Sequence, residues 1–133
     1  MTIQTKQTKQ QKRAKFALKK INEYKSSNMN ATEFHDLANF IVGMPNMILS
    51  NGLGQTLAFL LTKKDKQKET FNIIKEWIQD SENLSINISG NTPREFLTAF
   101  SEIDQKKYID VQNETLRLME WLKRYARAFD EKA

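Results

Sequence analysis

The sequence predicts an all-α protein, a single compact bundle of about six helices. The 133 residues include only four glycines and two prolines, too few for a sandwich or barrel with many tight turns. Helix-forming Lys, Gln, Glu, Leu and Ala are plentiful, and most segments repeat apolar residues at helical spacing. With 39% hydrophobic residues, the chain can bury one core. We therefore expect one domain over residues 1–133, with the first few residues flexible.

The first expected helix covers residues 5–25 and is amphipathic with a basic outer face. At about 100° per residue, one side collects Ala14, Ala17, Leu18, Ile21 and Tyr24. Between residues 6 and 25 there are eight Lys or Arg and one acid, Glu23. Phe16 falls among the lysines, so we expect it to contact a partner or to pack against a neighbouring loop.

The stretch 37–62 carries no charge at all, in a protein whose residues are 28% charged. Roughly 20 apolar residues span a bilayer, but polar and turn-forming residues interrupt this stretch too often. We interpret it as two consecutive core helices, the first beginning near Asn30 or Thr32 and ending at Asn51-Gly52. Pro45 is expected to bend this helix or divide it in two.

One side of the same helix carries a lane of small and polar residues. The lane consists of Asn39, Gly43, Asn46 and Ser50. Such residues allow two helices to approach closely, and a ligand or RNA contact is the alternative. We favour close packing with satisfied hydrogen bonds.

The end of the third expected helix is followed by a fourth and a fifth. The third ends near Lys63 and Lys64, and the fourth covers residues 65–80. Residues 81–91 are expected to form a loop despite alternating apolar side chains, because a lone strand has nothing to pair with. Thr92 as N-cap followed by Pro93 predicts the next helix start.

The last helix, expected over residues 104–131, has the most regular apolar pattern in the chain. Its stripe alternates spacings of three and four and comprises Tyr108, Val111, Thr115, Leu118, Leu122, Tyr125 and Phe129. A heptad stripe can join two copies, but over this length it favours sealing the side of a bundle. Trp121 and Leu116 lie beside the stripe, on a second buried face or at an interface.

Groups that could carry catalysis are scarce. The chain has no cysteine and one histidine, His35, which cannot form a two-histidine metal site alone. Asp104, Asp110 and Glu114 are expected on a solvated helix face, without a compact carboxylate cluster. The sequence therefore predicts no enzyme, catalytic residue, metal site, cofactor or small-molecule substrate.

The charge balance points to a polyanionic partner. The net charge is +5 and the isoelectric point is near 9.4, and lysines that neutralise phosphates bind nucleic acid without any sequence motif. The absence of cysteine and of a secretory signal favours the cytoplasm. The residues that we expect to face phosphates are Arg13, Lys20, Lys63, Lys123, Arg124 and Arg127.

Residues 44–63, MPNMILSNGLGQTLAFLLTK, closely resemble a segment of the small subunit of the Cmr complex. This complex is the type III-B CRISPR effector, which is guided by RNA to RNA. The segments Arg13–Ala17 and Trp121–Ala126 match two weaker motifs of the same family, so that the resemblance extends over almost the whole chain.

The resemblance implies a compact helical subunit without catalysis of its own. Such subunits stack in several copies along the effector, beside the subunits that hold the guide RNA, and help to form the groove for target RNA. The implied partners are other Cmr subunits, copies of this chain, and guide and target RNA, with no membrane. We expect Phe16 and Trp121 at a partner interface.

Two alternatives come from other classes of protein. A helical adaptor that binds only proteins would also explain the heptad stripe and Phe16. A DNA-binding helix-turn-helix regulator is disfavoured, because no short polar recognition helix follows a tight turn.

Overall fold

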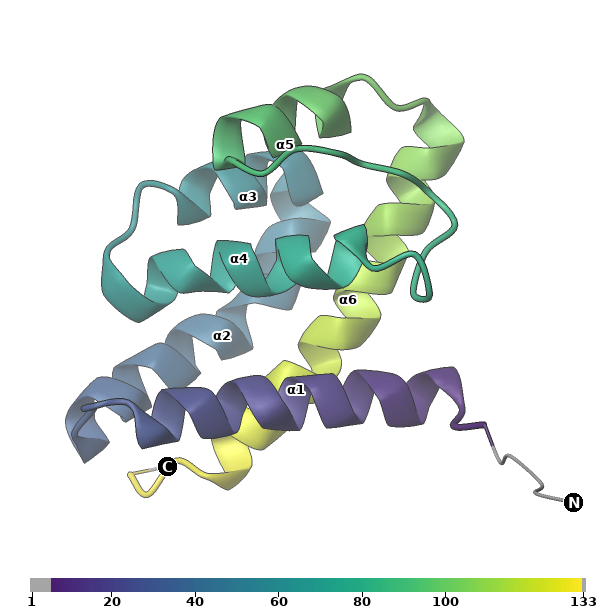
Figure 1. Cartoon of the computed structure of the whole chain (residues 1–133). Helices are drawn as coiled ribbons and strands as arrows, with labels where there is room; N and C mark the ends of the chain where they lie inside the picture. Colours follow the sequence, from purple (N-terminus) through teal and green to yellow (C-terminus); the bar gives the residue numbers. More distant parts are fainter. Residues whose placement is uncertain (1–5, 133) are drawn as a thin grey trace, which may run out of the picture.

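The structure, a computed structural model, describes residues 6–132, and this part of the chain is all-helical (Figure 1). The six helices are α1 (Lys9–Ser26), α2 (Ala31–Asn51), α3 (Leu53–Leu60), α4 (Asp65–Gln79), α5 (Pro93–Ser101) and α6 (Gln105–Ala128). Helix α6 runs the length of the molecule, from α5 at one end to α1 at the other (Figure 1). The predicted compact all-α fold is confirmed. The flexibility expected of the first residues concerns a segment outside the described residues.

Local capping signals set where the helices begin. In α1, Thr8 and Gln11 exchange backbone and side-chain hydrogen bonds in a capping box, so the helix begins later than predicted. Asn30 and Glu33 form the same arrangement before α2. Thr92 caps α5, with Pro93 in its first turn, as the sequence predicted.

Helix α2 continues through Pro45 from residue 31 to residue 51. The structure therefore excludes the alternative that Pro45 divides the helix, and α2 ends at Gly52, as the sequence predicted. Gly52 adopts a φ of 85°, which an L-residue rarely takes, and ends α2 before α3 begins. Pro45 is buried among core residues, so packing maintains the helix although one backbone donor is missing.

The small polar lane of α2 lies in solvent. Asn39, Gly43, Asn46 and Ser50 are all exposed, and a Cβ added at Gly43 would meet nothing within 4 Å. The prediction of close helix packing there is wrong. Together with exposed side chains of α3, this surface forms what we call the uncharged face, which consists of Asn39, Gly43, Asn46, Leu49, Ser50, Gln55 and Phe59.

The core lies where α6 packs against α1 and α2. From the predicted stripe of α6, Val111, Thr115, Leu118 and Leu122 are fully buried, which confirms that this stripe seals the bundle. At the other end, Phe71, Phe96, Phe100 and Tyr108 form a chain of ring contacts. No helix within residues 6–132 has the length and hydrophobicity needed to cross a bilayer.

The segment between α4 and α5 forms a loop, as predicted. Ile88 is buried in the core, and the side-chain amide of Gln79 donates hydrogen bonds to the carbonyl oxygens of Ile88 (3.1 Å) and Gly90 (2.8 Å). Gly90 has a φ of 122° and lies directly against the first turns of α5. The loop is therefore a packed part of the fold.

Candidate nucleic-acid interface

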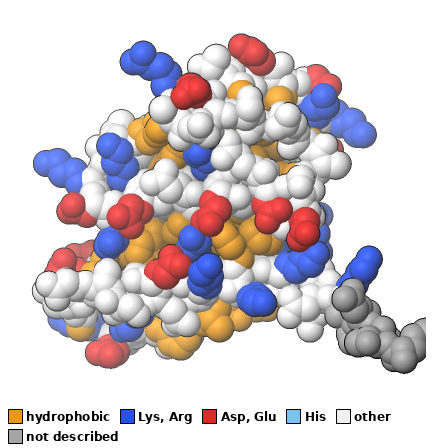
Figure 2. Space-filling model, in the orientation of Figure 1, with side chains coloured by type: hydrophobic (Ala, Val, Ile, Leu, Met, Phe, Trp, Pro, Cys, Tyr) orange, Lys and Arg blue, Asp and Glu red, His pale blue; other side chains and the backbone are white. Residues whose placement is uncertain are grey.

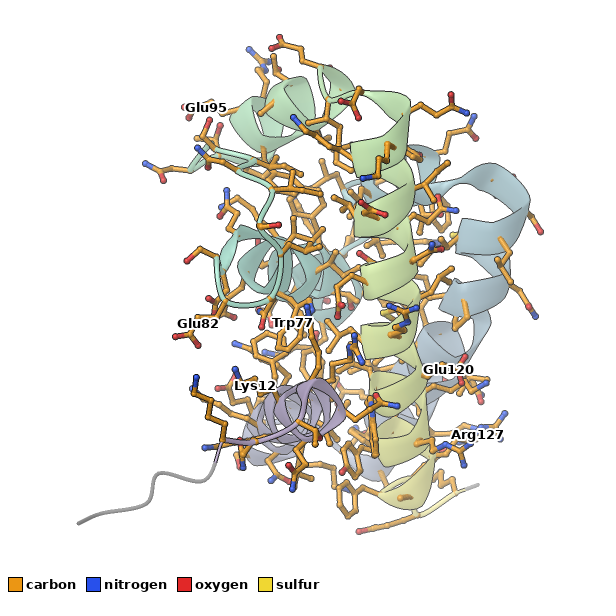
Figure 3. The ribbon with its side chains drawn as sticks, turned by 90° about the vertical axis from the view of Figure 1, so that its right-hand side faces the viewer. Lys12, Trp77, Glu82, Glu95, Glu120 and Arg127 are labelled. Atoms are coloured by element: carbon orange, nitrogen blue, oxygen red, sulfur yellow. The ribbon has the colours of Figure 1, made fainter. Side chains whose placement is uncertain are left out.

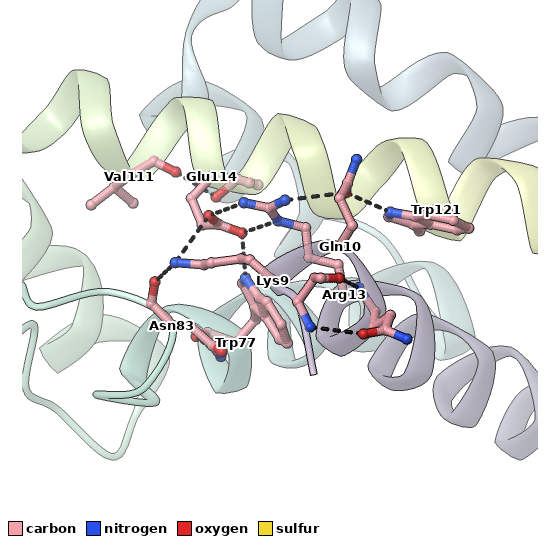
Figure 4. Close-up of polar contacts among 11 residues, drawn as sticks. Lys9, Gln10, Arg13, Trp77, Asn83, Val111, Glu114 and Trp121 are labelled. Carbon is pink, nitrogen blue, oxygen red and sulfur yellow. Dashed lines mark hydrogen bonds and ion pairs between the residues drawn. The ribbon is translucent and has the colours of Figure 1, made fainter. Parts of the chain in front are cut away.

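Arg13 forms a buried ion pair that joins α1 to α6. Its Nε and Nη2 donate to the two carboxylate oxygens of Glu114, both at 2.7 Å. Trp77 of α4 donates its Nε1–H to the same carboxylate at 3.0 Å, and Lys9 approaches it at 3.5 Å (Figure 4). Arg13 is 6% exposed and Glu114 is 3% exposed.

These positions correct two predictions. Arg13 cannot face a phosphate in this fold, because its guanidinium is occupied inside the protein. Glu114 does not lie on a solvated face, because it accepts hydrogen bonds from α1 and α4. The buried pair has excellent geometry, in which two parallel N–H groups meet one carboxylate.

The environment of Glu114 shifts its acidity. Burial raises the pKa of Glu114, but hydrogen bonds from Arg13 and Trp77 and the positive charges of Arg13 and Lys9 outweigh burial and hold this pKa below its ordinary value of 4.5. The carboxylate of Glu114 is therefore ionised in the folded protein at neutral pH.

This shift predicts acid sensitivity. A carboxyl whose pKa is lowered by folding contributes stability above its unfolded pKa and loses that contribution as pH falls through the folded pKa. We expect the free energy of unfolding to decrease as pH falls below about 4.5, more steeply in the wild type than in Glu114→Gln. Urea titrations at several pH values measure this slope, with Glu102→Gln, an exposed carboxylate, as control. Equal slopes in wild type and Glu114→Gln would contradict the assignment.

Lys20 and Phe16 are also engaged within the protein. The Lys20 ammonium lies 2.6 Å from Glu76 and 3.6 Å from Glu23, and its side chain is 14% exposed. The Phe16 ring contacts Trp77 with centroids 4.9 Å apart, and Trp77 lies between α4 and α1 (Figure 3). The expectation of a partner contact at Phe16 is thus replaced by packing against α4, and Lys20 already has carboxylate partners.

Lys63 lies at the end of α3, beside a surface pocket. Its ammonium is 4.7 Å from the centroid of the Phe59 ring. The pocket, of about 790 Å³, is lined by both cations and anions, including Lys64, Glu33 and Asp36. Lys63 is half-buried but has no carboxylate within ion-pair distance in the part of the chain that the structure describes.

The remaining predicted cations lie on the outer side of α6. Lys123 is 3.5 Å from Glu120, whereas Arg124 and Arg127 are exposed and have no ion-pair partner within residues 6–132. Glu120 and Arg127 extend from the same side of α6 in Figure 3. On the surface formed by α1 and α4, which faces the viewer in Figure 2, acidic and basic side chains alternate.

Arg117 belongs to this surface but was missed from the sequence. It is exposed, without a carboxylate partner among the described residues, and precedes Arg124 by seven residues. Two helical turns separate such residues, so they share one side of the helix. This spacing was the available signal. We call Arg117, Lys123, Arg124 and Arg127 the α6 basic face.

Trp121, the second predicted interface residue, is half-buried between α6 and the start of α1. Its Nε1–H donates to Oε1 of Gln10 at 3.0 Å. A pocket of about 370 Å³ adjoins the indole and is lined by Gln10, Arg117, Glu120, Trp121 and Arg124. The structure thus brings Trp121 together with Arg117 and Arg124, and separates all three from Lys63.

The described residues hold no group of three or more His, Asp or Glu side chains arranged to bind a metal ion. His35 forms a hydrogen bond of 2.7 Å with Asp130, and its other ring nitrogen lies 3.2 Å from the Asn39 amide. This arrangement attaches the C-terminal segment to α2.

Comparisons with known proteins agree on one family. Residues 9–129 match the family model described as CRISPR-associated protein (Cas_Cmr5). The fold resembles the crystal structure of a CRISPR-associated Cmr5 family protein from Thermus thermophilus, with a TM-score of 0.69. The alignment covers 95% of this chain and 100% of that chain at 24% sequence identity. The resemblance inferred from residues 44–63 is confirmed, and the chain belongs to the Cmr5 family, the small subunits of the type III-B Cmr complex.

Proposed function

We propose that this chain is a non-catalytic subunit that stacks along the Cmr effector and helps to hold guide and target RNA through the α6 basic face. It acts in the cytoplasm, beside the subunits that hold the guide RNA and beside copies of itself. The observation that carries this proposal is the separation of exposed charge. Three of the four arginines without carboxylate partners among the described residues lie on α6, and the fourth is Arg94 of α5, whereas the uncharged face covers α2 and α3.

The α6 basic face suits a phosphate backbone. Guanidinium groups bind phosphate oxygens through two parallel hydrogen bonds, and each neutralised phosphate releases a counterion. Arg117, Arg124 and Arg127 are available for such contacts, since no carboxylate of residues 6–132 lies within ion-pair distance of them. Binding of this kind reads the backbone and depends strongly on salt.

The uncharged face suits protein neighbours. The side chain of Leu49 is 66% exposed and that of Phe59 is 38% exposed, amid small polar residues. The residues of this face carry no charge themselves, and the nearest cation to Phe59 is Lys63, whose ammonium lies over the ring. Burying uncharged surface avoids the cost of burying an unpaired charge. A neighbouring Cmr subunit or a second copy of this chain can therefore pack here.

The RNA contact is tested by reversing the four cations of the α6 basic face. We expect R117E/K123E/R124E/R127E to weaken RNA binding more than tenfold at about 50 mM salt, and by a smaller factor at about 200 mM salt. The control reverses four exposed lysines elsewhere, Lys6, Lys15, Lys19 and Lys68. Filter binding with single-stranded RNA measures both. Unchanged binding of the quadruple variant at both salt concentrations would exclude the set.

A second candidate function is a helical adaptor that contacts only proteins of the complex. The exposed apolar side chains of Leu49 and Phe59 favour it. Co-expression of L49E/F59E with the other Cmr subunits tests the uncharged face, since we expect this variant to leave the particle while the isolated chain keeps its RNA affinity. Nuclease treatment of particles that carry the wild type or the quadruple α6 variant then separates the two functions, because the RNA that the particle protects stays the same if this chain is only an adaptor.

A further inference from the structure

A small pocket separates the first turn of α1 from the outer side of α6. Its volume is about 370 Å³, and its lining combines one indole, two guanidinium groups, one amide and one carboxylate, from Trp121, Arg117, Arg124, Gln10 and Glu120. Flat aromatic surface beside positive charge is the combination that single-stranded nucleic acids require, because each nucleotide offers a base to stack and a phosphate to neutralise.

The indole of Trp121 is connected through Gln10 to the buried Arg13. Oε1 of Gln10 accepts the Nε1–H of Trp121 at 3.0 Å and also accepts Nη1–H of Arg13 at 3.1 Å (Figure 4). Arg13 is itself fixed by its two hydrogen bonds to Glu114. The ring is therefore oriented before any ligand arrives, which reduces the entropy lost on binding.

The two arginines flank the indole along the helix axis. Arg117 and Arg124 are separated by two turns, about 10.5 Å of rise, with Trp121 between them. Neither has a carboxylate within ion-pair distance among residues 6–132. Glu120, the one acid that the described residues contribute to the pocket, lies 3.5 Å from Lys123, so its charge is partly neutralised.

Aromatic surface continues from the pocket along α6. The ring centroids of Trp121 and Tyr125 are 5.8 Å apart, and those of Tyr125 and Phe129 are 6.3 Å apart. All three rings are at least partly exposed, and successive rings are inclined by 30° and 9°. We call these three residues the aromatic row. It extends the site from one base to a short run of bases.

We propose that this pocket and the aromatic row form a stacking site for single-stranded RNA, with a base on Trp121 and the adjoining phosphates on Arg117 and Arg124. This inference rests on the proposed function and gives it a mode of binding. The contact recognises unpaired nucleotides rather than an RNA duplex, whose bases are already stacked on one another.

The chemistry of the pocket favours RNA over a protein partner. A docked helix would require an apolar groove, whereas the lining of this pocket combines one indole with polar and charged side chains. Arg117 and Arg124 would also need acidic partners at a protein interface, while RNA supplies an anion at every nucleotide.

Intrinsic fluorescence of the full-length chain tests the stacking. The protein has two tryptophans, and Trp77 is buried and hydrogen-bonded to Glu114, so that only Trp121 can meet RNA directly. We expect a short oligouridylate to quench the emission of the wild type and leave the emission of W121F unchanged. An RNA duplex of equal length should quench far less.

Pairs of variants distinguish the loss of base stacking from the loss of the hydrogen bond that holds the Trp121 ring. W121F and W121L both lose the hydrogen bond to Gln10, but only W121F keeps a ring, so we expect W121L to bind oligouridylate roughly tenfold more weakly than W121F. The RNA association constant K falls as salt rises, and R117Q/R124Q should make the slope of log K against log salt less steep by about 1.4. This is the value, about 1.4, for two phosphate contacts with a single strand. K15Q/K19Q removes two exposed charges from α1 and should leave this slope nearly unchanged.

The possible results show whether the stacking site or the proposed function is wrong. If the wild type binds RNA and the Trp121 and arginine variants bind equally well, the stacking site is wrong while RNA binding stands. If W121L keeps its RNA affinity but fails to assemble with Cmr subunits, the pocket is a protein contact and the inference is overturned. Absence of any quenching in the wild type at low salt also overturns it. Absence of RNA binding by the wild type at low salt, measured by filter binding, contradicts the proposed function itself.

Discussion

Replacing Glu114 with alanine is expected to lower the free energy of unfolding by about 3–5 kcal/mol. The change leaves the Arg13 guanidinium buried without a counter-charge and removes the acceptor of the Trp77 indole N–H. An uncompensated buried charge is among the most destabilising defects in a folded protein. Urea denaturation followed by circular dichroism measures the loss.

Two further variants identify the cause. Glu120→Ala removes an exposed carboxylate from the same helix and should change the free energy of unfolding by less than about 0.5 kcal/mol. R13M/E114L replaces both members of the pair with apolar groups and should recover most of the loss. If the double variant were as unstable as Glu114→Ala, the lost acceptor of the Trp77 N–H or packing at this site, rather than the unpaired charge, would account for the effect.

Replacing Gly90 with alanine is the second large expected effect, a loss of about 2–3 kcal/mol. A Cβ at this position would lie 2.5 Å from the backbone nitrogen of Phe96 and 2.7 Å from the carbonyl carbon of Glu95. The φ of 122° is also unfavourable for any L-residue with a side chain. The loop must therefore shift away from α5, which disturbs the neighbouring Ile88 in the core.

Gly43→Ala is a control that makes the same substitution but is expected to change the stability in the opposite direction. It lies inside α2 in open space, so Gly43→Ala should stabilise the protein by about 0.5–1 kcal/mol. Thermal unfolding of the two variants measures the contrast, and hydrogen exchange should show faster opening of α5 in Gly90→Ala. A neutral Gly90→Ala variant would show that the loop adapts without disturbing α5.

The helices could be predicted from the sequence because their signals are local. Thr92 with Pro93 starts a helix by satisfying backbone donors within one turn, and Gly52 ends one through its own backbone freedom. The apolar stripe of α6 likewise requires only the helical period. Local signals could not decide whether Pro45 divides α2, because the cost of the missing donor is local but its compensation, burial in the core, depends on distant residues.

The site was less accessible to sequence reasoning because its contacts join distant residues. Arg13 and Glu114 are separated by 101 residues, and the local sequence around one residue does not indicate that the other is its ion-pair partner. From the sequence, a basic residue on an amphipathic helix is a candidate for phosphate contact whether its side chain is exposed or, like that of Arg13, buried. Arg124 and Arg127 were placed correctly on the surface, since they lie opposite the apolar stripe of α6, whereas Arg117 required attention to the two-turn spacing.

The uncharged face has a consequence for how two basic molecules meet. With a net charge of +5, two copies repel each other at a distance, and a contact through charged surface would add to that repulsion at close range. Leu49 and Phe59 instead offer a contact whose strength depends on buried apolar area, which salt screens little. Ionic strength therefore acts on the two sides of this protein in opposite directions: added salt loosens the arginines of α6 from an anion and relieves repulsion between neighbouring copies.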